Sequence, residues 1–335
     1  MPRFRLSEIA RLGVTTFVAL LALVGAPATA HADPISLGGD LELAEPLVFT
    51  TPDSGIDCNG HTVRAFGISG ALQIASHSVT IRNCVIRSAL DGVVITSRAV
   101  GPGIVIENND ISVVTFAVRV SGATGDAQSD ILISNNVLAT THDESTIDIT
   151  DARFVTASGN IVEANPAGVG ITALRSRDIS IIANEVEPGP VIGIWVFQGQ
   201  DAEVSRNRVT ETNTGIYVQD TNGMTVSRNA VADTRAHGIR LGGVTVRGTI
   251  TATNNSVARC RVGLTADTTG EVLFASNHVE DNEDTGISLG VHVGYNGQPI
   301  VIRDNVLVNQ PEIRVGGSAR VPINLTMTNN QHIDN

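Results

Sequence analysis

Short runs of alternating apolar and polar residues recur along most of this chain and indicate β-strands. Val79–Arg82, Met224–Ser227 and Ile300–Arg303 are clear examples. Alternation over four residues is the period of a strand, whose side chains point to opposite faces in turn. The repeats contain no stretch with the three- and four-residue apolar spacing of amphipathic helices. The pattern therefore predicts an all-β chain built from many short strands.

Two short motifs divide these runs into repeats. An asparagine follows each run and precedes an apolar residue by two positions, and a Gly-apolar-x-apolar segment such as Gly193–Val196 comes about eight to ten residues later. Ala117, Thr146 and Glu312 replace this glycine in three repeats. The asparagines recur about every 22 to 28 residues, with a degenerate last copy, at Asn83, Asn109, Asn136, Asn160, Asn184, Asn207, Asn229, Asn255, Asn277, Asn305 and Asn330.

A repeat of about 25 residues with three strands can close once around an axis. Successive coils would then stack as parallel strands ~4.8 Å apart and form a rod of roughly 50 Å. We expect the asparagines to share one column, where each tolerates the left-handed backbone of a one-residue bend and joins an amide ladder. We expect the glycines where a side chain would be crowded. The pattern thus predicts a single parallel β-helix of about eleven coils, with three short strands per coil.

Three segments resemble the opening coils of right-handed parallel β-helix proteins of the pectate-lyase-like superfamily, including its members with NosD-like repeats: Asp57–Val63, Val79–Ile86 and Gly92–Ile95. The resemblance covers about residues 50–335. It is specific for the fold only, because the superfamily includes lyases, hydrolases, epimerases, adhesins and carrier-type proteins. It implies that the Gly-apolar-x-apolar strands form the first sheet, on which active sites of this superfamily usually lie.

Residues 1–32 have the features of a secretory signal peptide. Three arginines precede the apolar run Leu12–Ala26, which at about fifteen residues is too short to span a bilayer as a retained anchor. We expect residues 33–55 to form an N-terminal cap and residues 56–335 to form the β-helix. The leader therefore predicts a protein that is secreted, periplasmic or attached to the cell surface, without a membrane span. We also expect the protein to be a monomer.

The composition narrows the range of partners. The formal net charge is −12, and the leader carries three Arg and one Glu, so the mature chain is near −14. This charge argues against general binding to nucleic acids or anionic membranes. Three cysteines are too few for a secreted disulfide scaffold. The odd number leaves at least one free thiol, and Cys58 and Cys84 are candidates for a disulfide.

The x position of each Gly-apolar-x-apolar segment points outward, so that stacking makes a column of Val94, Arg119, Asp148, Thr172, Trp195, Tyr217, Arg240, Thr265, Ser288 and Arg314. The only Trp and one of the two Tyr are neighbours in this column. An aromatic platform flanked by Arg and Asp suits flat, hydroxyl-rich ligands such as sugars, although cross-strand packing alone would also explain it. We expect the following residues to bind a polysaccharide: Arg119, Trp195, Phe197, Gln219 and Asp267.

Four residues near this platform are candidates for catalysis: Tyr217, Asp220, His237 and Arg240. Arg240 could neutralise a sugar carboxylate while Tyr217 or His237 abstracts the adjacent proton. The segment Tyr217–Asp220 is similar to the Tyr-x-x-Asp of alginate C5-epimerases, but the Pro-His that follows in that motif is absent. If the chain is an enzyme, we therefore expect a polysaccharide lyase or C5-epimerase acting on a uronate polymer.

A non-catalytic interpretation stays open as the alternative. The four candidates could be solvated surface residues, with Arg240 paired to Asp220 or Asp267. The chain would then be a non-catalytic surface or envelope protein, such as an adhesin, a scaffold or a NosD-like accessory protein.

No cofactor is firmly indicated, and calcium is the alternative. Calcium prefers six to eight oxygen ligands. Two acidic clusters could supply some of them, although neither has a metal-ligand spacing: Asp143, Glu144, Asp148 and Asp151, and Glu280, Asp281, Glu283 and Asp284. The histidines His61, His142, His278 and His292 are scattered, which gives no support to a copper or zinc site.

The net charge leads to a first prediction. The mature protein should not bind duplex DNA at physiological salt, because its charge of the same sign opposes the polyanion. Fluorescence anisotropy with a labelled duplex measures this binding directly. Tight, salt-sensitive binding would contradict the inference from the net charge.

Overall fold

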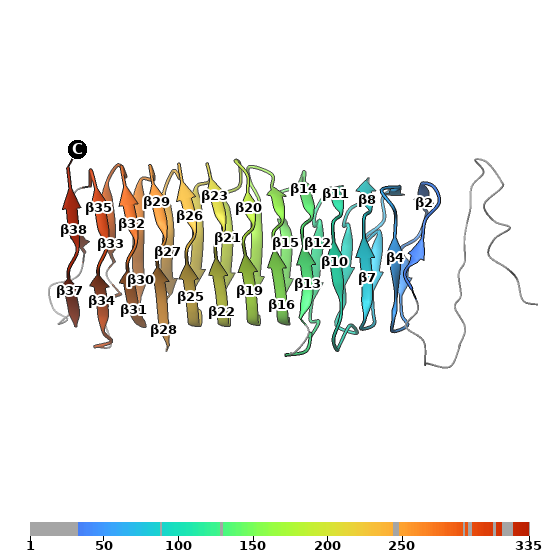
Figure 1. Ribbon diagram of the computed structural model, residues 1–335, viewed down its shortest axis with the longest axis horizontal. Helices are drawn as coiled ribbons and strands as arrows, with labels where there is room; N and C mark the ends of the chain where they lie inside the picture. The colour runs from blue at the N-terminus through green and yellow to red at the C-terminus, as the bar shows by residue number, and fades with distance from the viewer. Residues whose placement is uncertain are drawn as a thin grey trace, which may run out of the picture.

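The protein is a solenoid of three long parallel sheets, as the computed structural model shows (Figure 1). It describes residues 33–334 except 88, 128–129, 244–247, 291, 294–296, 311–312 and 317–323. The solenoid is right-handed with about 12 turns, close to the predicted eleven, and none of the described residues is helical. In the described part of the chain there is accordingly no helix that could span a membrane. The predicted signal peptide lies outside the described residues.

Consecutive strands join sheets A, B and C in turn, and each strand pairs in parallel with the strand one coil further on. Sheet A contains β1 (Ile35–Ser36), β4 (Ser54–Asp57), β7 (Val79–Arg82), β10 (Val105–Glu107), β13 (Ile131–Ser134), β16 (Arg153–Ser158), β19 (Arg177–Ile182), β22 (Gln200–Ser205), β25 (Asn222–Ser227), β28 (Thr249–Thr253), β31 (Glu271–Ala275), β34 (Ile300–Arg303) and β37 (Leu325–Thr328). Sheet B contains β2 (Leu41–Leu43), β5 (Thr62–Ala65), β8 (Val85–Arg87), β11 (Asp110–Val113), β14 (Val137–Thr140), β17 (Ile161–Glu163), β20 (Glu185–Val186), β23 (Arg208–Thr210), β26 (Ala230–Ala232), β29 (Ser256–Ala258), β32 (His278–Glu280), β35 (Val306–Val308) and β38 (Gln331–Ile333).

Sheet C is the sheet of the Gly-apolar-x-apolar segments. It contains β3 (Leu47–Phe49), β6 (Leu72–Ile74), β9 (Val93–Ile95), β12 (Val118–Ser121), β15 (Ser145–Thr150), β18 (Val169–Leu174), β21 (Ile192–Phe197), β24 (Thr214–Gln219), β27 (His237–Gly243), β30 (Val262–Thr268), β33 (Thr285–Leu289) and β36 (Arg314–Val315). The segment expected to form a cap supplies β1, β2 and β3, which pair with β4, β5 and β6 of the next coil.

Buried asparagines form a hydrogen-bonded ladder at the bend between sheets A and B. The backbone N and the Nδ2 of Asn207 both donate to Oδ1 of Asn229, at 2.9 and 3.0 Å, and the same Nδ2 donates to the carbonyl of Ile181 at 2.8 Å. Each amide therefore joins the coil before it to the coil after it. The predicted ladder is confirmed for Asn109, Asn136, Asn160, Asn184, Asn207, Asn229, Asn255, Asn277, Asn305 and Asn330.

Two details of this bend differ from the prediction. The left-handed residue is not the ladder asparagine but the residue before it, such as Arg206 with φ 58°. Asn83 is left-handed itself, with φ 53°, so Cys84 takes the ladder position and its backbone N donates to Asn109 Oδ1 at 3.0 Å. The side chain of Asn83 instead donates to Asp57 Oδ1 at 3.0 Å. The bend thus needs a left-handed residue and a buried acceptor at adjacent positions, and asparagine suits both.

The cysteines complete the N-terminal end of this column. Cys58 and Cys84 form a disulfide across adjacent coils, with their Cα atoms 4.7 Å apart. Cys260 is buried and unpaired. The candidate disulfide is therefore present, and it links two coils at the position that asparagines occupy in the later coils.

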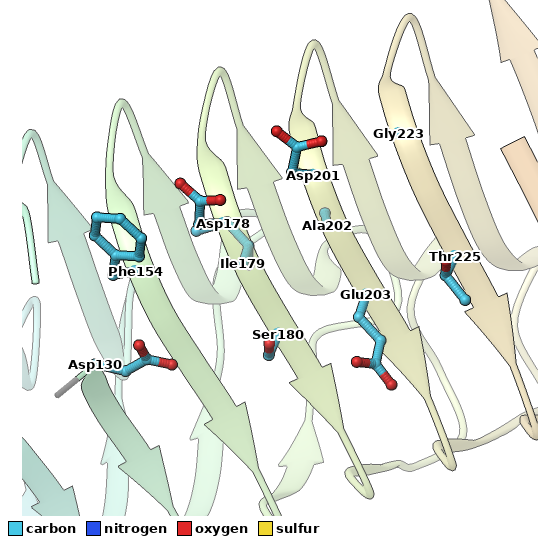
Figure 2. A pocket seen from close by; sticks show the side chains of 10 residues that line it. All are labelled: Asp130, Phe154, Asp178, Ile179, Ser180, Asp201, Ala202, Glu203, Gly223 and Thr225. Carbon is cyan, nitrogen blue, oxygen red and sulfur yellow. The ribbon is translucent and has the colours of Figure 1, made fainter. Parts of the chain in front are cut away.

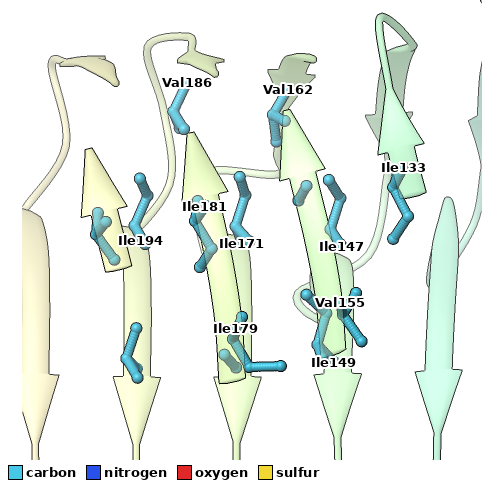
Figure 3. Close-up of a cluster of buried hydrophobic side chains, with 14 of the residues drawn as sticks. Ile133, Ile147, Ile149, Val155, Val162, Ile171, Ile179, Ile181, Val186 and Ile194 are labelled. Atoms are coloured by element: carbon cyan, nitrogen blue, oxygen red, sulfur yellow. The ribbon is translucent and has the colours of Figure 1, made fainter. Parts of the chain in front are cut away.

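Aliphatic side chains fill the interior in stacks that run along the axis (Figure 3). The inward residues Ile194, Val196, Ile216 and Val218 are 0 to 1% exposed, as predicted. A Cβ on Gly215 would lie 2.3 Å from Val231 Cγ1 and 2.6 Å from the carbonyl oxygen of the next coil's glycine. The glycine of the repeat is therefore required by close packing against the next coil.

Ile216→Ala should lower the free energy of unfolding by about 2–5 kcal/mol, because a densely packed core relaxes little around a cavity. Chemical denaturation monitored by circular dichroism measures this change. A loss below about 1 kcal/mol would mean that the side chain does not lie in such a core.

Candidate functional site on sheet C

The outward column of sheet C brings together side chains that lie about 22 residues apart in the sequence. The register pairs Trp195 on β21 with Tyr217 on β24, and Tyr217 with Arg240 on β27. Two residues further along the same two strands, Phe197 pairs with Gln219. All five side chains are half-buried rather than fully exposed. We call Trp195, Phe197, Tyr217 and Arg240 the aromatic strip.

The rings of the strip lie nearly parallel to one another. The centroid of Trp195 is 5.5 Å from that of Phe197 and 6.4 Å from that of Tyr217, with interplanar angles of 15° and 6°. The Cζ of Arg240 lies 4.9 Å from the centroid of Tyr217. The strip is thus a continuous row of three rings that ends in a guanidinium group stacked on the last ring.

The guanidinium group of Arg240 stacks on the ring of Tyr217 and makes no ion pair with Asp267, which was one of its two expected partners. Asp267, two residues beyond the column on β30, instead accepts a hydrogen bond from the backbone N of His292 at 3.2 Å and hydrogen-bonds with its Nδ1 at 2.9 Å. The Nε of Arg240 and the Nε1 of Trp195 are buried and have no partner. The guanidinium group of Arg240 therefore carries a positive charge that forms no ion pair with the described residues around it.

His237 lies at the start of β27, beside the strip. Its Nδ1 hydrogen-bonds with the hydroxyl of Thr265 at 2.9 Å. Burial, together with the positive charges of Arg240 and Arg261, lowers the pKa of His237 from 6.5 to about 4. The imidazole is consequently neutral at neutral pH and can accept a proton.

Tyr217 is less suited to the role of base. Burial raises the pKa of its phenol, the charge of Arg240 opposes this rise, and the nearby Asp220 and Asp267 add to it. A raised pKa keeps the phenol protonated at neutral pH. Of these two residues, the neutral imidazole of His237 rather than the protonated phenol of Tyr217 can accept a proton.

Arg119 does not join the strip. Its place in the column is separated from Trp195 by Asp148 and Thr172, and three strand spacings correspond to roughly 14 Å. Arg119 lies over the ring of Phe116 at 4.7 Å and pairs with Asp148 at 3.5 Å. The predicted polysaccharide-binding set is thus divided between two places on sheet C.

The acidic clusters proposed for calcium are divided among other partners. Burial raises the pKa of Asp148, which is 8% exposed, and Thr150 donates a hydrogen bond to it at 2.9 Å. Arg175 donates to both oxygens of Asp151 at 2.8 Å and lowers the pKa of that carboxyl. In the second cluster, Asp284 pairs with Arg261 at 2.7 Å. Among the residues that the structure describes, no three His, Cys, Asp or Glu side chains are grouped so that they could hold a metal ion.

Two hollows of the surface lie away from the strip. One, of about 420 Å³, is on sheet A and is lined by acidic residues of neighbouring coils, including Asp178, Asp201 and Glu203 (Figure 2). The other, of about 390 Å³, lies beside the disulfide at Asn59 and Asn83. Sequence reasoning missed the first hollow, because the alternation of strand residues does not show that Asp178 and Asp201 sit at left-handed bulges, with φ 55° and 52°.

The low pKa of His237 gives a prediction about pH. Because the unfolded chain binds this proton near pH 6.5 and the folded chain binds it only at about pH 4, the unfolded state holds it more tightly. His237 should therefore not affect the free energy of unfolding above about pH 6.5, and should lower it as the pH falls from 6.5 towards 4. An NMR titration of the ring measures the midpoint, and His237→Gln should remove this part of the pH dependence. A midpoint near 6.5 would contradict the burial described above.

Comparison with known proteins supports the fold. Residues 54–189 match the family model described as "Periplasmic copper-binding protein (NosD)", and residues 192–335 match the model described as "Right handed beta helix region". A search of the curated proteins found no match.

Several solved structures are similar to the chain. The Dettilon tailspike protein gp208 has 13% identity and a TM-score of 0.53 over 84% of this chain and 61% of its own. The GH136 lacto-N-biosidase from Eubacterium ramulus has 12% identity and a TM-score of 0.49 over 89% of this chain and 61% of its own. The A-module of the Azotobacter vinelandii mannuronan C-5 epimerase AlgE4 has 12% identity and a TM-score of 0.40 over 90% and 84%.

The chain therefore spans less than two thirds of the length of the tailspike. Similarity at this level of identity shows the fold alone. Taken with the three sheets and the two family models, each of which matches less than half of the chain, it shows that the chain has the right-handed parallel β-helix fold.

Proposed function

We propose that this protein is secreted or periplasmic and binds a polysaccharide along the aromatic strip of sheet C. The observation that carries the proposal is the row of three near-parallel rings on an outward face. Large rings on an outer face are costly without a partner, and their flat surfaces suit the apolar faces of sugar rings.

Arg240 favours an acidic polysaccharide. Its guanidinium group ends the strip without an ion pair to the described carboxylates, and a planar guanidinium is well suited to bind a carboxylate through two hydrogen bonds. A uronate-containing glycan offers such a group on each acidic sugar. We therefore propose a uronate polymer as the ligand.

A reaction on this glycan is an extension of the binding proposal. A lyase or C5-epimerase abstracts the proton next to the sugar carboxylate. We assign this step to His237 from its position at the start of β27, where its ring hydrogen-bonds with Thr265 of the outward column and lies near Arg240, which could hold the carboxylate. The strip lines neither of the two hollows described above, and binding on an open face does not itself require catalysis.

A second candidate function is that of a non-catalytic accessory protein, and the NosD match of residues 54–189 favours it. The side chains of the described residues do not form a site that fits copper. The described residues hold no group of three potential ligands, Cys58 and Cys84 are joined in a disulfide, and Cys260 is buried. We therefore assign no role to copper in this chain.

Trp195→Ala should weaken binding of the preferred glycan by about 1–3 kcal/mol, on the scale of stacking by one aromatic side chain. Isothermal titration with alginate and polygalacturonate oligosaccharides measures this loss, with a neutral dextran as the ligand control. Absorbance of unsaturated products in the same mixtures, with and without calcium, detects a lyase.

Phe66→Ala is the matched control, because Phe66 is an aromatic residue that is 63% exposed and lies outside the strip. It should leave glycan binding unchanged. If Trp195→Ala instead destabilises the fold by several kcal/mol and glycan binding is unchanged, the rings serve packing and the accessory function becomes the better explanation.

A further inference from the structure

Gly242 occupies a position on the outer face of sheet C where the backbone does not demand glycine. It lies on β27, in register with Gln219 of the preceding coil and Asp267 of the following coil. Its φ is outside the left-handed region, in contrast to its neighbour Gly243 with φ 119°. Its neighbours in register, Gln219 and Asp267, carry side chains, so the sheet itself does not require a glycine at this position.

The ring of Tyr217 fills the space that a side chain at position 242 would need. A Cβ on Gly242 would lie 3.1 Å from Cε2 and 3.4 Å from Oη of Tyr217, and its third-nearest atom is Cζ of the same ring. This differs from Gly215 in the repeat motif, where a Cβ would meet the backbone of the next coil. The three atoms nearest to a Cβ at position 242 all belong to the tyrosine ring, which would have to shift by a few tenths of an ångström to admit a side chain.

Asp267 and Gly290 repeat this arrangement further along the column. A Cβ on Gly290 would lie 2.6 Å from Oδ1 of Asp267, so the carboxylate lies over the glycine of the following coil. There it accepts the hydrogen bond from the backbone N of His292. In both cases the missing side chain lets a functional group of the preceding coil lean along the axis.

The position of the Tyr217 ring holds the strip together. From its place over Gly242 the ring lies at 6° to the plane of Trp195 and stacks beneath Arg240 at 4.9 Å. A ring pushed away from Gly242 would change both contacts, since it lies between the two partners. The continuity of the strip from Phe197 to Arg240 therefore depends on position 242.

We propose that Gly242 is a positioning residue, which holds the ring of Tyr217 between Trp195 and Arg240 by leaving space for it. The consequence for ring position follows from the geometry alone. The consequence for glycan affinity rests on the proposed function of the strip. Two separate measurements can therefore distinguish a failure of this proposal from a failure of the binding function.

The first measurement uses fluorescence without ligand. Trp195 is the only tryptophan of the chain, so its emission reports on the strip. Gly242→Val should shift the emission maximum or intensity, and Gly242→Ala should do so less, because a methyl group needs the ring to move only slightly. Gly39→Val is the control, because a Cβ on Gly39 meets no atom within 4 Å, and it should leave the emission unchanged. Melting temperatures of all variants verify that they are folded.

The second measurement is a double-mutant cycle on the binding of polygalacturonate and alginate oligosaccharides. Gly242→Val should weaken binding by about tenfold, the scale of one lost stacking contact. In the Tyr217→Ala background the same substitution should have no further effect, because the ring that it displaces is gone.

Two results would overturn the proposal. One is an unchanged Trp195 emission in folded Gly242→Val, and the other is a loss of affinity that adds fully to that of Tyr217→Ala. If the emission changes as expected but the unsubstituted protein binds neither glycan, the positioning role stands and the proposed function fails.

Discussion

The ladder of buried asparagine amides is the interaction on which the rest of the structure depends. Between the two ends of the ladder, each amide accepts two hydrogen bonds from the coil before it and donates to the coil after it and to a backbone carbonyl. An unpaired polar group in this aliphatic interior would cost about 1–3 kcal/mol. A slip of one residue would break the column and turn every strand side chain to the opposite face. The ladder therefore stabilises the register as well as the coil.

This register determines what the outer face of sheet C can do. Trp195, Tyr217 and Arg240 come from three separate repeats, and they become neighbours only because β21, β24 and β27 pair without a shift. The strand spacing of ~4.8 Å is short enough for rings of adjacent coils to lie against one another. A repeat that serves stability thus also aligns side chains into a linear surface, which suits a linear ligand better than a compact one.

The features that depend on periodicity could be predicted from the sequence, and those that depend on contacts between side chains of adjacent coils could not. The three sheets, the aliphatic core and the outward column follow from spacing alone. The sequence pattern placed Asn83 in the ladder, whereas Cys84 holds that position in the structure. The error arose because both positions of the bend accept asparagine. The pairing of Asp151 with Arg175 and the lean of Tyr217 over Gly242 depend on contacts between coils, which the pattern of one repeat does not contain.

Hydrogen exchange of the asparagine side chains tests the ladder most directly. Both Nδ2 protons of Asn184, Asn207 and Asn229 should exchange as slowly as the backbone amides of the adjacent strands, because both are donated inside the core. NMR spectra recorded after transfer to deuterated buffer resolve these side-chain signals. Exchange at the rate of a free amide, while the backbone amides stay protected, would show that the asparagines do not hold the coils in register.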